Sequence, residues 1–259
     1  MGHYHRIVNL SQRLRITPMD TGALDKLVEF GSSSGTAMAA LWLLLGREAW
    51  CGDRVAILGY EGRPNDLSPE AIAATGLDGT AFYDETLGSA ATLARSVLVG
   101  RGISTFTTET FDGVELLRAH PVAEVAPAGV EVVAVDMDRA QLLDPAQFGD
   151  SRDLHLSAAT GGLGGITTAL AAVLAASNRG GGRGGGDLRS RDPVVGSWAG
   201  DRVGVLPIDL AREFVDVSAR VRGALAEAGE GRYEISGGEV TRPMPPWVAR
   251  AADVQGERG

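Results

Sequence analysis

Cysteine is nearly missing from this 259-residue chain, because Cys51 is the single example. No intrachain disulfide is therefore possible, and a zinc site built on thiolates would need other ligands. Long apolar runs are missing as well, since those at 41–45 and 169–176 are too short to span a bilayer. The opening residues, Met-Gly-His-Tyr-His-Arg, do not resemble a signal peptide. We therefore expect a cytoplasmic protein and no membrane partner.

Aromatic residues and positive charges are scarce. Aromatics make up 5% of the chain, whereas 44% of it is hydrophobic, so small and aliphatic side chains must build most of the core. The net charge is −9 and the pI is near 5.0. This balance makes nucleic acid an unlikely partner, because a polyanion is repelled by a broadly acidic surface. The length suits one large domain or two small ones.

The chain contains what looks like the same unit twice. Two strings are nearly identical, Trp-Cys-Gly-Asp-Arg-Val at 50–55 and Trp-Ala-Gly-Asp-Arg-Val at 198–203. Four further pairs are identical and all lie 127 positions apart: Val8 and Val135, Pro18 and Pro145, Gly22 and Gly149, Leu27 and Leu154. A constant offset of this kind predicts a duplication, which determines architecture before any single motif does.

Each unit alternates strands with helices. The apolar and turn patterns predict strands at 6–10, 27–30 and 53–58 with a helix at 36–47, and then strands at 132–135, 154–157 and 202–206 with a helix at 166–177. Alanine-rich helices follow at 84–99 and 216–228. The sequence therefore predicts an α/β fold, with two tandem related units packed as a pseudo-two-fold fused dimer.

The predicted organisation has four parts. Repeat unit one covers 1–101, a connector covers 102–129, repeat unit two covers 130–234, and a tail or docking arm covers 235–259. The tail lacks hydrophobic periodicity, which is typical of segments that pack weakly or bind a partner.

A glycine- and arginine-rich loop distinguishes the second unit. Glycine amides and guanidinium groups suit a phosphate-bearing ligand or RNA, although the lysine that ends a P-loop is missing. The candidate ligand-binding residues of this loop are Arg179, Gly181, Arg183 and Asp187. The alternative is a flexible surface insertion. The glycines at 161–165 match a dinucleotide-binding pattern only in part. The segment 133–138 resembles the acidic strand end of a methyl-donor enzyme but precedes the glycines, and duplication explains it better because Asp136 aligns with Asn9.

Three further candidates complete the site hypothesis. Asp201 and Arg202 recur as Asp53 and Arg54, so they either close a structural turn or act with the loop of the second unit. In a pseudo-dimer, a composite site between the units would join His3, His5 and Asn9 from the first unit with Arg183, Asp187 and Asp201 from the second. The two tryptophans beside these strings would be core or interface anchors.

A metal site is also conceivable at the start of the chain. His3 and His5 lie two positions apart on a predicted strand and would point to the same face, where two imidazoles are able to bind a metal. The alternative is an ordinary strand end. No cofactor follows from these patterns.

Three strings resemble those of a bacterial family of small proteins without an assigned function. They are Met-Gly-His-Tyr-His, Arg-Gly-Gly-Gly-Asp and Gly-Ser-Trp-Ala-Gly-Asp-Arg, and the resemblance covers about 1–60 and 131–225. It implies a shared fold, here duplicated, and no activity.

Two functions remain open from the sequence. The leading hypothesis is a non-catalytic protein that assembles with itself as a homo-oligomer or binds another protein, because catalytic residue types are scarce. The alternative is an enzyme or binding protein for an anionic small molecule, either phosphate-bearing or nucleotide-like, which would use the glycine- and arginine-rich loop.

Overall fold

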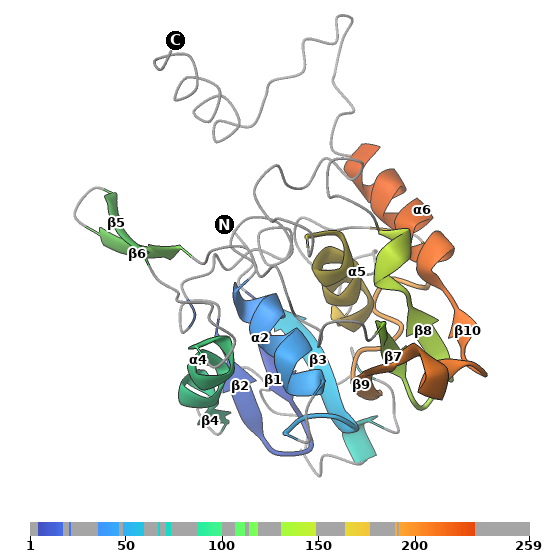
Figure 1. Ribbon diagram of the computed structural model, residues 1–259, viewed down its shortest axis with the longest axis horizontal. Helices are drawn as coiled ribbons and strands as arrows, with labels where there is room; N and C mark the ends of the chain where they lie inside the picture. The colour runs from blue at the N-terminus through green and yellow to red at the C-terminus, as the bar shows by residue number, and fades with distance from the viewer. Residues whose placement is uncertain are drawn as a thin grey trace, which may run out of the picture.

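A computed structural model describes the parts of the chain that build its central sheet (Figure 1). The described residues are 5–17, 21, 36–46, 49–59, 67, 71–73, 87–99, 107–111, 114–118, 131–148, 164–176, 190 and 192–230. No helix within these segments is long and apolar enough to cross a membrane.

Within the described segments, eight strands form one sheet in the order β10-β8-β7-β9-β3-β1-β2-β4. Four of its strands form the N-terminal half: β1 (His5–Asn9), β2 (Leu14–Ile16), β3 (Asp53–Gly59) and β4 (Gly88–Ser89). The other four form the C-terminal half: β7 (Val132–Asp136), β8 (Gln141–Leu143), β9 (Arg202–Pro207) and β10 (Val215–Asp216). The antiparallel pair β3–β9 joins the halves, with Arg54 opposite Arg202.

The strand directions are the same in both halves. β1 is antiparallel to β2 and to β3, just as β7 is antiparallel to β8 and to β9. The outer strands β4 and β10 are parallel to their neighbours β2 and β8. The result is a mixed sheet with helices, which confirms the predicted α/β class.

Four helices cover one face of this sheet: α2 (Thr36–Leu45), α4 (Ala91–Val99), α5 (Gly164–Leu174) and α6 (Ser218–Glu230) (Figure 1). Alternate strand residues such as Ile7, Ile57 and Val203 point toward the helices and are fully buried. Most of this core is aliphatic, as the composition predicts, and its two largest members are the buried Trp50 and Trp198. Removing this apolar surface from water is the main force that holds the layers together.

The opposite face has a separate cover over each half. Val8, Ala56 and Leu58 pack beneath Leu67 and Ala71 in the N-terminal half. In the C-terminal half, the cover is the 3₁₀ helix η5 (Ile208–Ala211) together with Phe214. Both faces of the central strands are therefore buried, as their continuous apolar runs predict.

A residue just beyond a helix in each half also contacts a strand of the other half. Ala176, just beyond α5, donates its backbone N–H to the carbonyl of Ile57 on β3 at 2.9 Å. Gly46, just beyond α2, lies against Val205 on β9, where an added Cβ would be 3.7 Å from the Val205 Cβ. The described residues of both predicted repeat units thus share one sheet and one main core.

Some predicted elements need correction. The predicted helix at 84–99 begins at Ala91, because β4 occupies 88–89, and the helix predicted at 216–228 begins at Ser218. Strands β2 and β8 were not predicted, and the 3₁₀ helix η3 (Pro145–Gln147) follows β8. The predicted connector contains a separate hairpin of β5 (Thr107–Phe111) and β6 (Val114–Arg118). The strands predicted at 27–30 and 154–157, and the tail, lie outside the described residues.

Candidate functional site

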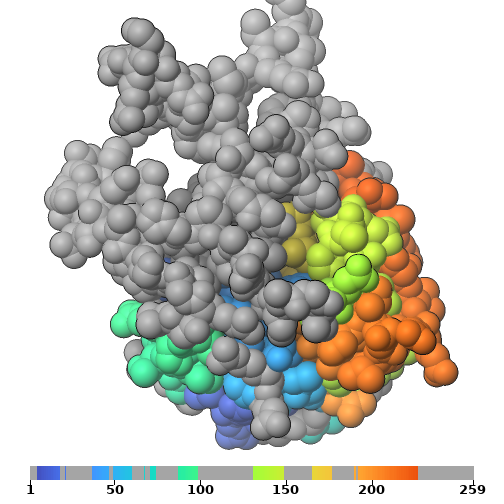
Figure 2. Space-filling model, in the orientation of Figure 1, coloured from blue at the N-terminus to red at the C-terminus, as the bar shows by residue number. Residues whose placement is uncertain are grey.

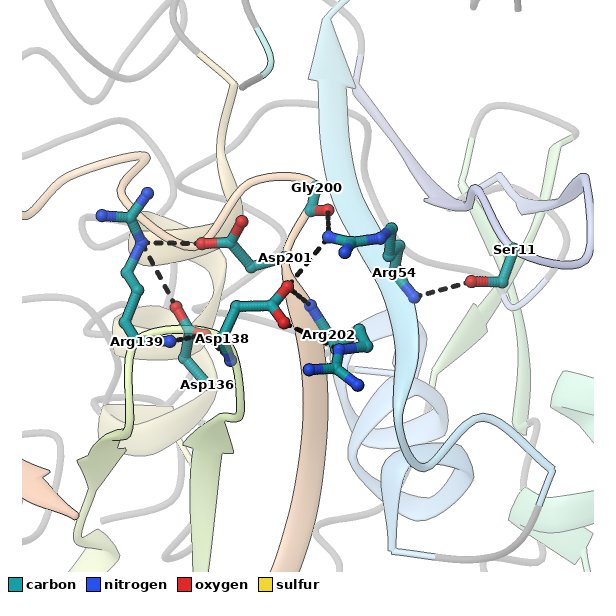
Figure 3. A network of polar contacts seen from close by, with 8 residues as sticks. All are labelled: Ser11, Arg54, Asp136, Asp138, Arg139, Gly200, Asp201 and Arg202. Atoms are coloured by element: carbon teal, nitrogen blue, oxygen red, sulfur yellow. Dashed lines mark hydrogen bonds and ion pairs between the residues drawn. The ribbon is translucent and has the colours of Figure 1, made fainter. Parts of the chain in front are cut away.

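A network of polar side chains lies where the two halves meet (Figure 3). It occupies the turns after β1 and β7 and the beginnings of β3 and β9. Gly52 and Gly200 precede the latter two strands with φ of +85° and +86°, a conformation that favours glycine. Arg13 and Ala140 end the other two turns with φ of +55° and +52°. The same two backbone bends, one after the first strand and one before the third, therefore place the polar side chains in each half.

Asn9 organises the N-terminal side of the network. Its Oδ1 accepts a hydrogen bond from the backbone N–H of Gln12 at 2.9 Å, which closes the turn after β1. Its Nδ2 donates to Oδ2 of Asp53 at 2.7 Å. Gln12 also donates, from Nε2, to the same carboxylate oxygen at 2.7 Å and to the carbonyl of Ala49 at 2.6 Å. Asp53 is thus held by two neutral amide donors.

Asp136 occupies the corresponding place on the C-terminal side. Its Oδ1 accepts from the backbone N–H groups of Asp138 and Arg139, at 2.9 and 3.0 Å. Arg139 donates from Nε to Oδ2 of Asp201 at 2.7 Å and lies 3.5 Å from Oδ2 of Asp136. Asp136 and Asp201 are 0% and 5% exposed, so two carboxyl groups are buried side by side with one guanidinium.

Burial and charge change the protonation of this cluster. Burial is the main cause that raises the pKa of Asp136 to about 7, and the charge of Asp201 and a hydrogen bond with its side chain add to the effect. The backbone N–H groups of Arg139 and Asp138 act in the opposite direction. Burial alone would lower the pKa of Arg139, but the hydrogen bond and charge of Asp201 outweigh it and raise that pKa.

Asp138 links the two halves at the centre of the network. Its Oδ1 accepts from Nε of Arg202 at 2.7 Å, and its Oδ2 accepts from Nη1 of Arg54 at 2.8 Å (Figure 3). Burial opposes its ionisation, but the hydrogen bonds from Arg202 and the charges of both arginines prevail and lower its pKa. Nη1 of Arg54 also donates to the carbonyl of Gly200 at 3.0 Å. Asp138 is therefore an anion that bridges two cations from different halves.

Comparisons of the chain with protein-family models, with curated proteins and with solved structures find no match. The resemblance to a bacterial family accordingly stays a prediction, and the site must be interpreted from its own geometry.

The described members of the predicted composite site lie in different parts of this network. Asn9 contacts Asp53 within the N-terminal half, whereas Asp201 contacts Arg139 within the C-terminal half. Arg202 contacts Asp138 and is 52% exposed at its side chain. The four loop candidates, Arg179, Gly181, Arg183 and Asp187, lie outside the described residues. Their role stays a prediction.

The structure describes one of the two histidines that were predicted to bind a metal. His5 is buried and lies opposite Gly59 in the β1–β3 pair, at the other end of these strands from Asn9, while His3 lies outside the described residues. Among the described residues, no group of three histidine, cysteine or acidic side chains is arranged to hold a metal ion.

Sequence reasoning did not select Gln12, Asp138 or Arg139 for the site. The signal that would have found them is the constant offset of 127 positions, which aligns Asn9 with Asp136 and Gln12 with Arg139. Both pairs differ by an amide in the first half and a charged side chain in the second, and the same offset pairs Ser11 with Asp138. The buried pair Asp136 and Asp201 is suited to holding a proton, and Asp138 bridges the two halves.

Proposed function

We propose that the protein is a non-catalytic assembly protein, in which a duplicated α/β unit forms a pseudo-two-fold fused dimer and presents surfaces to further copies or to another protein. The observation that carries this proposal is the contact between β3 and β9. Gly52 donates its backbone N–H to the carbonyl of Val203 at 2.8 Å, and Gly200 donates to the carbonyl of Val55 at 2.9 Å. Gly52 corresponds to Gly200 and Val55 to Val203, each 148 positions later. Replacing each residue by its counterpart turns one bond into the other, which is the relation that a two-fold axis produces.

Contacts within the halves support the same proposal. Leu10 donates to the carbonyl of Arg54 at 2.8 Å, and Met137 donates to the carbonyl of Arg202 at 2.8 Å. The backbone N–H of Arg54 is bound by Ser11, and that of Arg202 is bound by the aligned Asp138. Each of these backbone bonds in one half thus has a counterpart in the other. A duplicated unit explains this agreement without any functional constraint on the site.

The use of the polar residues supports a structural role for them. Asn9 and Asp136 each close a turn through Oδ1, and their partners Asp53 and Asp201 are held by the side chains of the same turns. Because the site candidates are engaged in this way in both halves, we interpret the Gly-Asp-Arg strings as connectors of strands and turns.

The edge formed by β10 supports assembly. β10 is the last strand of the sheet in the described segments, and an edge strand presents backbone groups with which another chain is able to pair. Val215 on β10 itself is 63% exposed, and Leu210 on the preceding 3₁₀ helix η5 is 69% exposed. The segment from η5 to α6, coloured orange to red, lies at the surface in Figure 2. We propose this edge as the contact surface for a second copy or for another protein.

Light scattering at micromolar concentration tests the proposal. We expect a species larger than the 26.9 kDa monomer, and we expect Val215→Lys to shift the distribution toward the monomer by roughly tenfold in dissociation constant, because it places a charge in an apolar contact. Thr92→Lys on α4, which adds the same charge to an exposed position far along the sheet, is the matched control. A monomer at every concentration, together with no bound protein partner in pull-down experiments, would contradict the proposal.

The cytoplasmic location is part of this proposal and rests on the sequence alone. Binding of a phosphate-bearing small molecule through the glycine- and arginine-rich loop stays the alternative prediction.

A further inference from the structure

The hydrogen bond between Asn9 and Asp53 shows what the turn geometry requires. The side chain after β1 has one oxygen that closes the turn and one group that faces the aspartate at the beginning of β3. In Asn9 that second group is an amide N–H, which is able to donate to Oδ2 of Asp53 at 2.7 Å. A donor at this place satisfies the neighbouring carboxylate, which a second acceptor would not do.

Asp136 has an oxygen at the place where Asn9 has its amide. Its Oδ2 is buried and has no hydrogen-bond donor among the described residues. The nearest cation, Nε of Arg139, is 3.5 Å away and is bound to Asp201 at the shorter distance of 2.7 Å. Two ionised carboxylates are unable to hydrogen-bond to each other, because neither has a hydrogen to donate. A proton on one of them supplies the missing donor.

The charges around Asp136 favour this protonation. The groups that face it are Asp201 from the segment before β9 and Asp138 and Arg139 from its own turn. The side chain of Arg139 is 45% exposed, so water weakens its attraction for the buried carboxylates. Arg202 on β9 and Arg54 on β3 are engaged by Asp138. One partly hydrated guanidinium therefore faces two buried carboxyl groups, which together hold a single negative charge most favourably.

We propose that Asp136 and Asp201 share one proton, and that loss of this proton to water loosens the turn at 137–140 and with it the bridge that Asp138 makes between the halves. When protonated, Oδ2 of Asp136 donates to the carboxylate of Asp201. When the proton leaves, two negative charges repel each other at the beginning of the turn. Because Oδ1 of Asp136 holds the backbone of Asp138, the repulsion acts on the contact from Asp138 to Arg54.

This proton makes stability depend on pH in a definite direction. The folded-state pKa of Asp136 is about 7, above the ordinary value of 3.8 that applies when the chain is unfolded. The folded state therefore binds the proton more tightly than the unfolded state. The stabilisation is fully present below about pH 4, and it is lost as the pH rises through about 7.

Carbon-13 NMR of aspartate carboxyl groups in the full chain tests the proposal, followed from pH 4 to pH 9. We expect one carboxyl resonance to titrate near neutral pH. We also expect the exchange protection of the Asp138 and Arg139 amides, measured relative to the intrinsic base-catalysed rate at each pH, to fall at least several-fold above that midpoint. Asp136→Asn, which copies Asn9, is expected to remove the neutral titration and to make the protection of these two amides independent of pH. If every aspartate titrates below pH 5, the proposal is wrong.

A matched variant in the other half keeps the test decisive if Asp136→Asn does not fold. Asn9→Asp places a carboxyl group beside Asp53 in the same geometry, with Gln12 in place of Arg139. We expect it to create a new group that titrates near neutral pH and a new loss of melting temperature as the pH rises. An Asn9→Asp variant whose pH profile equals that of the wild type would overturn the geometric argument.

Discussion

The two halves of the sheet each hold an aspartate near the start of an inner strand, but they hold it with different side chains. In the N-terminal half, Asn9 and Gln12 hold Asp53 with neutral amides. In the C-terminal half, Asp136 adds a second acid, and Arg139 occupies the position of Gln12. The exchange of an amide for an acid is thus accompanied by the exchange of an amide for a base. The comparison teaches that backbone turns set the positions, whereas each pair of side chains sets the charge and the response to pH.

The buried tryptophans differ in a similar way. Nε1 of Trp198 donates to Oε1 of Gln141 at 2.9 Å, whereas Nε1 of Trp50 has no acceptor among the described residues. The position of Gln141 is taken by Leu14 in the N-terminal half, 127 positions earlier. An unsatisfied buried N–H costs about 1–3 kcal/mol. Gln141 therefore gives the buried indole of the C-terminal half an acceptor, whereas the corresponding position of the N-terminal half has the apolar side chain of Leu14.

The largest expected difference concerns the glycines before β3 and β9. Gly200→Ala combines a positive φ with a new Cβ only 2.6 Å from the Cβ of Ala71, so we expect it to lower the free energy of unfolding by about 2–4 kcal/mol. Gly52→Ala has the same φ, but its nearest new neighbour is the sulfur of Met137 at 3.9 Å, so we expect about 1 kcal/mol. Denaturant unfolding of both variants measures this difference. Equal losses of unfolding free energy would show that the close contact with Ala71 does not add to the cost of Gly200→Ala.

An intermediate effect is expected from the base that accompanies the second acid. Arg139→Gln copies Gln12 and leaves Asp136 and Asp201 without their cation, so we expect a loss of about 1–2 kcal/mol at pH 8 after allowing for the exposure of Arg139. The loss is expected to be smaller at pH 5, where Asp136 is protonated.

The double variant sharpens this test. Adding Asp136→Asn to Arg139→Gln recreates the amide pair of the N-terminal half and is expected to recover most of the stability at pH 8. A double-mutant cycle measures the coupling. If the two losses simply add, the paired exchange of amides for charges has no energetic basis.

The fold class and the central strands could be predicted because their apolar runs are long enough to show a pattern. The runs at Val55–Leu58 and Val132–Val135 became β3 and β7, buried on both faces. Strands β2 and β8 have three residues each, and β4 and β10 have two, so they carry no periodicity and are held by their neighbours. They could not have been predicted from local patterns.

The site was predictable only in part. The recurring Gly-Asp-Arg strings drew attention to Asp201 and Arg202, and both lie in the network. Their partners were missed because a turn brings Arg139 to Asp201 from a distant part of the chain, and hydrophobic patterns do not report such contacts. Asn9 was predicted to join a composite site, but its hydrogen bonds to Gln12 and Asp53 lie within its own half.

The smallest expected effect concerns the beginnings of α4 and α6. Oγ of Ser89 accepts from the backbone N–H of Ala91 at 3.2 Å, whereas Oδ1 of the aligned Asp216 accepts from Ser218 at 2.8 Å. A carboxylate at a helix N-terminus gains from the unpaired N–H groups and from the helix dipole, so we expect Ser89→Asp to raise the free energy of unfolding by about 0.3–1 kcal/mol at pH 7. Ser89→Asn, which keeps the acceptor and lacks the charge, is the matched control. The gain of Ser89→Asp over this control should fall as added salt screens the charge and should vanish below pH 3, where the carboxyl is protonated. A gain that persists at low pH would show that geometry, and not charge, distinguishes the two helix starts.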